Sequence, residues 1–184
     1  EFQREIERPE TRFDRSFNGP HHQLKVHNFV TQNTFVDGRS TYKINLGYIY
    51  NRRKEQEGND ERFLPDSLQF GNLNMILKTV SLDAGWVYTV SRNTELTIAT
   101  QEFLQSNTNT GYRRLIPDAD VKSASLTGIL NFHKDKFTFE GGARYDLFSL
   151  KTTEYGVKDS IDYFPAISPH YNSVNGSAGV TYLL

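Results

Sequence analysis

The chain has 184 residues, a length typical of one domain, and it is nearly neutral, with 21 Lys and Arg against 22 Asp and Glu. This balance argues against a nucleic-acid partner, because dedicated binders carry a basic surface that follows the phosphates. No stretch approaches the roughly 18 apolar residues of a membrane-spanning helix. The absence of cysteine excludes a disulfide framework and thiol chemistry.

The residue pattern predicts an all-β chain. Aromatic residues make up 13% of the sequence although the mean hydropathy is only −0.61. Disordered chains lack aromatic residues to bury, so disorder over the whole length is excluded. Helical periodicity is rare, whereas alternation of apolar and polar residues recurs from about residue 22 to the end.

Seven strands are predicted, over residues 22–36, 40–53, 68–90, 94–106, 121–133, 137–150 and 172–184. The first strand mixes the two residue types. In the second, the apolar residues that share one face are Tyr42, Ile44, Leu46, Tyr48 and Tyr50. The strand over 137–150 separates its faces most sharply, with Phe137, Phe139, Ala143, Tyr145 and Leu147 opposite Glu140, Arg144 and Asp146.

The connections between these strands are of two kinds. Residues 37–40, 91–94 and 134–136 are short polar turns of the kind that hairpins use, whereas 51–67, 106–120 and 151–171 are long connections. In an antiparallel meander, alternate connections emerge at the same end of the sheet. We therefore expect every short turn at one end and every long loop at the other, which is the general plan of outer-membrane barrels.

The aromatic residues are expected to form two girdles on the apolar face. The short-turn girdle would comprise Phe35, Trp86, Tyr88, Phe132, Phe137 and Tyr182, and the loop-side girdle Tyr48, Tyr50, Phe103, Tyr145 and Phe148. Such girdles mark the two interfaces of a lipid bilayer. The alternative is the ordinary preference of aromatic residues for strands. Alternation does not distinguish inside from outside, so a soluble ligand-binding barrel of lipocalin or streptavidin type, with Tyr42, Leu46 and Tyr145 inward, remains a second hypothesis.

Three sequence segments resemble TonB-dependent outer-membrane receptors. The strand from Phe137 to Asp146 resembles that family's Gly-Gly-X-Arg-Tyr-Asp strand, and Leu115-Ile116-Pro117-Asp118 resembles a loop element of receptors from the Bacteroidetes group. Residues 45–48 followed by 51–55 are similar to one of its strand-to-loop junctions. In this order and spacing, the resemblance covers about residues 22–184.

The resemblance implies an antiparallel up-and-down meander within a transmembrane β-barrel of about 22 strands that encloses a plug domain. We expect residues 1–21 to be a loop or the end of a preceding strand, with 1–7 as the candidate for an eighth strand. Residues 22–184 would form a partial β-barrel of about seven strands in the bacterial outer membrane. TonB would be contacted only through the missing plug domain, and an isolated fragment would self-associate through its open strand edges.

Candidate ligand-binding residues lie in two of the long connections, expected to be extracellular. Arg52 and Arg53 begin a run of mixed charge, and Tyr112, Arg113 and Arg114 combine an aromatic ring with guanidinium groups suited to carboxylate or catecholate groups. A plain solvated loop is the alternative for both. The family resemblance implies a scarce nutrient as ligand, such as a ferric siderophore or haem.

No catalytic site is predicted. Arg144 lies between Glu140 and Asp146, which favours a luminal ion pair over the paired carboxylates of a glycoside hydrolase. Adjacent His21 and His22 point to opposite strand faces, which disfavours a metal site with His27. We expect a transport protein without cofactor or metal whose partners are outer-membrane lipid and a small-molecule nutrient. A small structural outer-membrane barrel is a third hypothesis.

Overall fold

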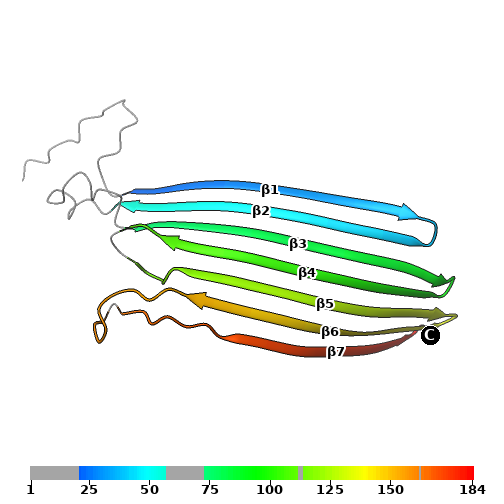
Figure 1. The fold of residues 1–184 in the computed structure, drawn as a ribbon. Coiled ribbons are helices and arrows are strands. Elements are labelled where there is room, and N and C mark those ends of the chain that lie inside the picture. Colours follow the sequence, from blue (N-terminus) through cyan, green and yellow to red (C-terminus); the bar gives the residue numbers. More distant parts are fainter. Residues whose placement is uncertain (1–20, 57–72, 112–113, 162) are drawn as a thin grey trace, which may run out of the picture.

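The computed structural model describes residues 21–56, 73–111, 114–161 and 163–184. They form seven strands: β1 (His21–Asp37), β2 (Ser40–Gln56), β3 (Leu73–Ser91), β4 (Thr94–Asn109), β5 (Ala119–Lys134), β6 (Phe137–Thr152) and β7 (His170–Tyr182). Each strand pairs antiparallel with the next one in the sequence, giving the sheet order β1-β2-β3-β4-β5-β6-β7 (Figure 1). The predicted all-β meander of seven strands is confirmed.

The predicted strand ends needed correction at the loop end of the sheet. β2 continues to Gln56 instead of ending at 53, and β4 reaches Asn109 instead of ending at 106. The predicted beginning of the third strand, residues 68–72, lies outside the described residues. Arg52 and Arg53 therefore lie on a strand, because their backbone groups pair with β1 and β3. The candidate eighth strand over 1–7 lies outside the described residues. Among the residues that are described, no helix is long and apolar enough to cross a membrane.

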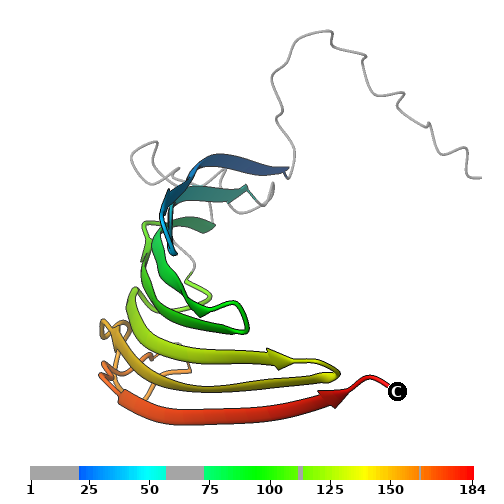
Figure 2. The same cartoon turned by 90° about the vertical axis from the view of Figure 1, so that its right-hand side faces the viewer.

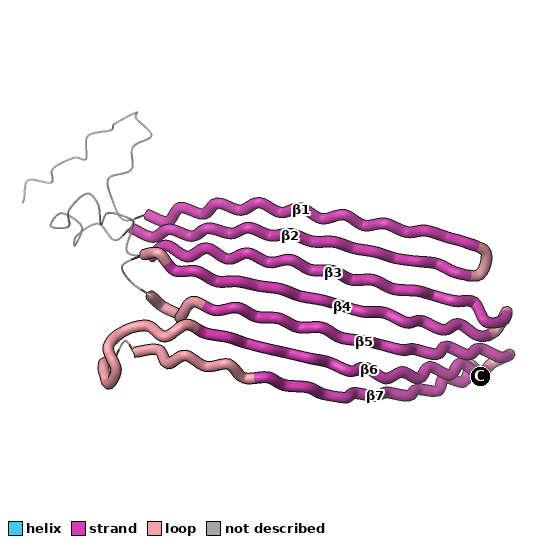
Figure 3. The backbone as a smooth tube through the Cα atoms, viewed as in Figure 1, coloured by secondary structure: helices cyan, strands magenta, loops and turns pink. Residues whose placement is uncertain are grey.

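The two ends of the sheet differ as expected. The turns that join β1 to β2, β3 to β4 and β5 to β6 lie together at one end (Figures 1 and 3). The described parts of the connections from β4 to β5 and from β6 to β7 lie at the other end. Gly38 and Asp135 adopt positive φ angles of 57° and 52° within two of these turns. Glycine and aspartate tolerate this left-handed backbone conformation better than most residues, which explains why the chain reverses at these points.

The sheet is curved (Figure 2). A hydrogen bond between non-adjacent strands indicates that its polar face is the concave one. Arg144 on β6 donates a hydrogen bond to Gln101 on β4 at 2.7 Å although β5 lies between them, so the side chains of this face converge. Thr79, Asn107 and Ser125 belong to the same face and are buried. The concave face therefore provides a polar lining.

Large apolar side chains cover the convex face and remain exposed. Tyr42, Leu46 and Tyr145 are 42%, 43% and 42% exposed, and Leu73 is the one buried hydrophobic residue in the described parts of the chain. An exposed apolar surface of this extent is rare in soluble monomers and typical of proteins that contact lipid or a partner. The inward orientation required by a soluble lipocalin-type barrel is therefore contradicted.

Two members of the expected loop-side girdle were assigned to the wrong face. Phe103 pairs with Ser81 and Ser123, and Phe148 pairs with Ser123 and Tyr171, all of which belong to the concave side. The cause is strict alternation, since their sequence neighbours Leu104 and Leu147 occupy the convex face. Tyr48, Tyr50 and Tyr145 do lie on the convex side.

The aromatic residues near the short turns follow a line that slants across the strands. The residues level with Phe35 on successive strands are Tyr42, Trp86, Ile98, Gly128, Ala143 and Gly176. The aromatic residue on β7 is Tyr182, six positions beyond Gly176 (182 − 176 = 6). At about 3.3 Å per residue and about 4.8 Å between strands, this displacement of about 20 Å across about 29 Å corresponds to a slant of about 35°. A girdle that stays level with a bilayer requires strands tilted by this amount, which matches outer-membrane barrels.

Candidate functional site

A hydrogen-bonded network of polar side chains crosses the concave face from β3 to β7. Gln101 donates to Asp83 at 2.8 Å, and Arg144 donates through Nη1 to Gln101 and through Nε to Asp146, both at 2.7 Å. Asn175 completes the chain by donating to the second carboxylate oxygen of Asp146 at 3.2 Å. Arg144 therefore holds together acceptors that belong to separate strands.

The register of the sheet places these groups side by side. One row of paired positions contains Gln32, Asn45, Asp83, Gln101, Ser125, Asp146 and Ser173, all of them polar. The Ser125 hydroxyl in this row is buried without a hydrogen-bond partner and lines a hollow of about 210 Å³. Such a row binds water or polar solutes, and Phe103 on the same concave face adds one aromatic ring to the lining of the hollow.

The adjacent row forms a shallow trough with a cation at each end. Gly85, Ala99 and Thr127 supply small side chains between Lys43 and Arg144, so the floor is low and a hollow of about 690 Å³ results. Asp83 and Glu95 also line it, which makes its charge mixed. The trough is suited to polar groups that carry hydroxyls, amides or charges.

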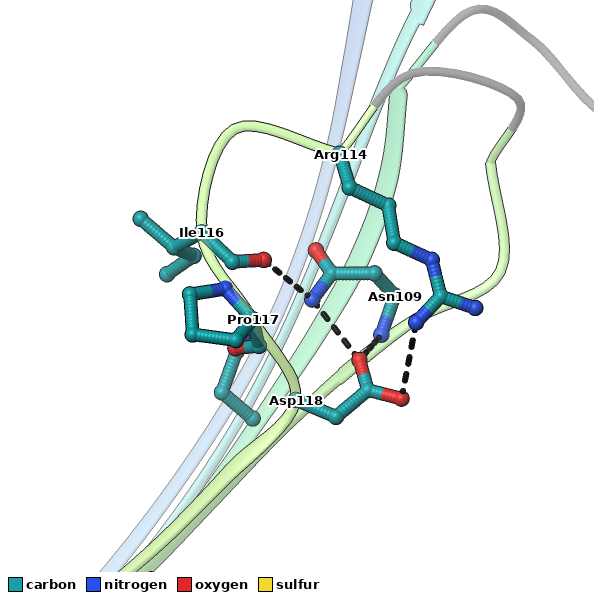
Figure 4. A network of polar contacts seen from close by, with 6 residues as sticks. Asn109, Arg114, Ile116, Pro117 and Asp118 are labelled. Carbon is teal, nitrogen blue, oxygen red and sulfur yellow. Dashed lines mark hydrogen bonds and ion pairs between the residues drawn. The ribbon is translucent and has the colours of Figure 1, made fainter. Parts of the chain in front are cut away.

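The connection between β4 and β5 is fixed to the sheet by Asn109 and Asp118 (Figure 4). One Asp118 oxygen accepts hydrogen bonds from the backbone N–H and the side-chain amide of Asn109, at 2.7 and 2.8 Å. The same amide also donates to the carbonyl oxygen of Ile116 at 3.0 Å. Because Asn109 is almost completely buried, these bonds satisfy groups that water cannot reach.

Arg114 links this connection to the one between β6 and β7. Its Nη1 lies 3.3 Å from the second oxygen of Asp118, and its guanidinium group lies 4.1 Å from the centre of the Tyr155 ring. Tyr155 in turn forms a β-bridge with Phe164. Nearby, partial desolvation and the Glu154 carboxylate, which accepts a hydrogen bond from Tyr163, raise the pKa of the Tyr163 hydroxyl. The two loops therefore act as one structured surface.

The arginines predicted to bind a ligand occupy three different environments. Arg52 faces the convex side and donates to Asn74 at 3.1 Å, and Asn74 donates to Thr110 at 2.6 Å. Arg53 faces the concave side, where it forms an ion pair with Glu55. Arg114 is held by Asp118 and Tyr155, whereas Tyr112 and Arg113 lie outside the described residues.

Sequence reasoning missed most of the concave network. Arg144 and Asp146 were predicted to form a luminal ion pair, and they do, at 2.7 Å. Gln101, Asp83 and Asn175 were not singled out, because only the register of the sheet shows that they meet. Their positions on the polar side of the alternation were the available signal. Within the described ranges, no group of three or more His, Asp or Glu residues is arranged to hold a metal ion.

Comparison with known families identifies the sheet. Residues 5–184 match the family described as TonB dependent receptor-like, beta-barrel. The chain belongs to this family. Its members are outer-membrane transport proteins and not enzymes, so the resemblance seen in the sequence is confirmed at the level of the family. No curated protein and no solved structure gave a significant match.

Proposed function

We propose that the chain forms part of the wall and the ligand-capture surface of a receptor that imports a scarce nutrient across the bacterial outer membrane. The single observation that carries this proposal is the division of the sheet into an apolar convex face and a hydrogen-bonded polar concave face. The slanted aromatic girdle supports the same orientation in a bilayer. A ferric siderophore, haem or a similar iron chelate is the nutrient class we propose.

The seven strands are proposed to be an arc of a larger closed barrel. β1 and β7 are the outermost strands of the sheet, and they do not pair with each other in the described part of the chain. In lipid, each unpaired backbone N–H and C=O group costs several kcal/mol, so open sheet edges do not occur there. Further strands, up to the about 22 of a plugged transporter barrel, would cover both edges. Without them, copies would self-associate through these edges.

Ligand capture is proposed at the loop end and involves no chemistry on the ligand. The joined β4–β5 and β6–β7 connections provide a firm support, and Arg53, Tyr112 and Arg113 are the proposed contacts to a carboxylate or catecholate group. Arg52 and Arg114 would act mainly by positioning, since Asn74, Asp118 and Tyr155 already engage their guanidinium groups. Release would follow rearrangement of a TonB-coupled plug domain inside the barrel.

A binding assay on the receptor tests this proposal. A ferric tris-catecholate complex, haem and a neutral sugar are titrated against the protein and against Arg53→Ala combined with Arg113→Ala. Hydrogen bonds to charged groups contribute about 1.5–3 kcal/mol each, so the iron chelate that is the ligand should bind at least about tenfold more weakly to this variant. Arg92→Ala, in a short turn at the opposite end, is the matched control.

Two results would contradict the proposed capture site. The first is unchanged affinity in the variant that lacks Arg53 and Arg113. The second is an equal loss in Arg92→Ala, which would indicate a general effect of charge. Tighter binding of the neutral sugar than of either iron chelate would instead refute the proposed nutrient class.

A further inference from the structure

The convex face changes character toward the loop end, where it becomes cationic. Beyond the apolar positions, five basic residues on five strands border the apolar band, namely Lys25, Arg52, Lys78, Lys122 and Lys151 on β1, β2, β3, β5 and β6, and Lys54 lies farther toward the end of β2 on the same face. We call these five residues the cationic belt. The four lysines are exposed. The belt thus borders the apolar band on the side of the long connections.

The lysines of the belt have no partner in the described part of the chain. Lys25, Lys78, Lys122 and Lys151 form no ion pair or hydrogen bond with any described residue. Two acidic residues, Glu102 and Asp120, share this region of the convex face, and neither forms an ion pair there. Among the described residues of this region, positive charge is therefore in excess and is not neutralised by ion pairs.

A hollow of about 430 Å³ lies where the belt meets the apolar band, across β4 to β7. Its convex-face lining combines the apolar side chains of Leu104, Ala124 and Leu147 with polar groups. These polar groups are Lys122, Ser149 and His170 in the row nearer the loops, and Glu102 and Asn172 in the row nearer the short turns. The small side chains of Ala124 and Ser149 leave room between larger neighbours. The hollow therefore offers apolar contacts beside one cation, with Ser149, His170 and Asn172 as further hydrogen-bonding groups and the Glu102 carboxylate at its β4 side.

We propose that this hollow binds an anionic lipid of the outer leaflet, with its phosphate group at Lys122 and its acyl chain along Leu147. This inference rests on the proposed orientation of the convex face in lipid. Lysine is a compact charge that pairs well with phosphate, and basic pockets at the membrane surface bind anionic head groups. Ser149 and His170 supply additional polar contacts.

We expect a lipid and not a soluble anion, because the apolar surface of the hollow is continuous with the apolar band of the convex face. Leu126, two positions from Ala124 toward the short turns, is 58% exposed on the same convex face, so the floor continues into the lipid-facing band. A free phosphate ion would gain nothing from these contacts. A phospholipid or glycolipid would bury its acyl chain there and extend its head group toward the belt.

The test measures lipid bound to the full chain in detergent by native mass spectrometry. The probes are a diphosphorylated lipid A and the zwitterionic dioleoylphosphatidylcholine. Combining Lys122→Gln with Lys151→Gln should weaken lipid A binding about fivefold per lysine removed, with little effect on the zwitterionic lipid. Lys134→Gln combined with Lys136→Gln makes the same charge change at the short-turn end and should retain full affinity.

Three outcomes would overturn the lipid site. They are unchanged lipid A binding in the Lys122 and Lys151 variant, an equal loss in the Lys134 and Lys136 control, and displacement of the lipid by millimolar inorganic phosphate. The last result would identify a site for soluble anions. Retained affinity in the control together with the expected loss in the variant supports the site.

A second readout separates this inference from the proposed membrane orientation. Trp86 is the one tryptophan of the chain and lies on the convex face. In vesicles, phosphatidylcholine brominated on its acyl chains should quench its fluorescence. Quenching combined with unaltered lipid A binding in the lysine variant would refute the lipid site alone. Absence of quenching would refute the lipid-facing wall itself.

Discussion

Arg144 is the residue on which the concave network depends. It donates to Asp146 and Gln101, and through them Asn175 and Asp83 are connected. A charge-assisted hydrogen bond contributes about 1.5–3 kcal/mol when it is shielded from water, and less at a wet surface. Because Arg144 is partly exposed, the low end of this range applies to the network.

We expect Arg144→Ala to reduce the free energy of unfolding by about 1–2 kcal/mol. The loss arises because the Gln101 carbonyl oxygen would lose its Arg144 donor and Asp146 would retain only the hydrogen bond from Asn175. Arg144→Lys keeps the charge but not the forked geometry, so it should recover only part of the loss. Urea unfolding of the protein in lipid vesicles, followed by Trp86 fluorescence, measures both. Equal stability of all three proteins would show that the network is energetically neutral.

Gly111 allows the β4–β5 connection to lie against β3. A Cβ atom at this position would clash with the backbone N of Asn74 and lie 2.9 Å from backbone atoms of Leu73. We expect Gly111→Ala to displace the connection and to increase trypsin cleavage after Arg114, detected by mass spectrometry. Gly128→Ala is the control, since a Cβ there has no neighbour within 4 Å. Unchanged cleavage in Gly111→Ala would contradict the close packing.

At the residue scale, the sequence indicated which residue types matter but not their partners. Arg114 was identified as a loop cation, and its ion pair with Asp118 is local in sequence. Its contact with Tyr155, by contrast, joins two separate connections, and no local sequence pattern predicts this contact. The same holds for Gln101 and Asp83, which meet only because of the pairing between β3 and β4.

At the scale of single strands, alternation predicted the strands well. It did not predict that the polarity of the two faces changes along each strand toward the loop end. Toward the loop end, apolar Leu77, Val121 and Leu150 lie on the concave side. Lysines take the corresponding convex positions there, as in the cationic belt. The physical reason is that strands extending beyond the bilayer meet water on their outer surface. The ends of β2 and β4 were underestimated because polar residues there suggested loops.

β5 provides a matched pair of adjacent positions that tests which face contacts lipid. Leu126 faces the convex side and Thr127 the concave side. We expect Leu126→Arg to reduce the free energy of unfolding in vesicles by about 2–4 kcal/mol, the usual effect of a cation facing the middle of a bilayer. Thr127→Arg should reduce the free energy of unfolding much less, because its charge would lie in the water-filled lumen. Both are measured by urea titration.

The reverse order of these two variants would contradict the membrane orientation. In a water-soluble sheet, Leu126→Arg would leave the free energy of unfolding almost unchanged, because position 126 would be exposed to water. Thr127→Arg would lower it, because the new side chain would clash with the network around Arg144 and Gln101. The comparison therefore separates the two environments without reference to any ligand. Identical small effects would show that neither face contacts lipid.

At the scale of the whole molecule, the sheet lacks the central apolar core of a soluble domain. Its apolar residues point outward and its polar residues point inward, so burial of the convex face depends on an external apolar phase. The sequence predicted the meander and the separation of turns from loops. It did not reveal the curvature or which face is concave, because both arise from side chains on non-adjacent strands, such as Arg144 and Gln101.

The slant of the short-turn girdle predicts the orientation of the strands in the membrane. If Phe35 and Tyr182 lie at the same interface, their offset of about 20 Å along the strands requires a tilt of about 35° from the bilayer normal. Polarised infrared spectroscopy of the protein in oriented bilayers measures this angle from the dichroism of the amide I band. Strands nearly parallel to the normal would place the two rings about 20 Å apart in depth, and the girdle could not mark one interface. A tilt near 35° requires the sheet to cross the bilayer obliquely, as a barrel wall does, and this same tilt places Lys25, Lys78 and Lys122 of the cationic belt at one depth.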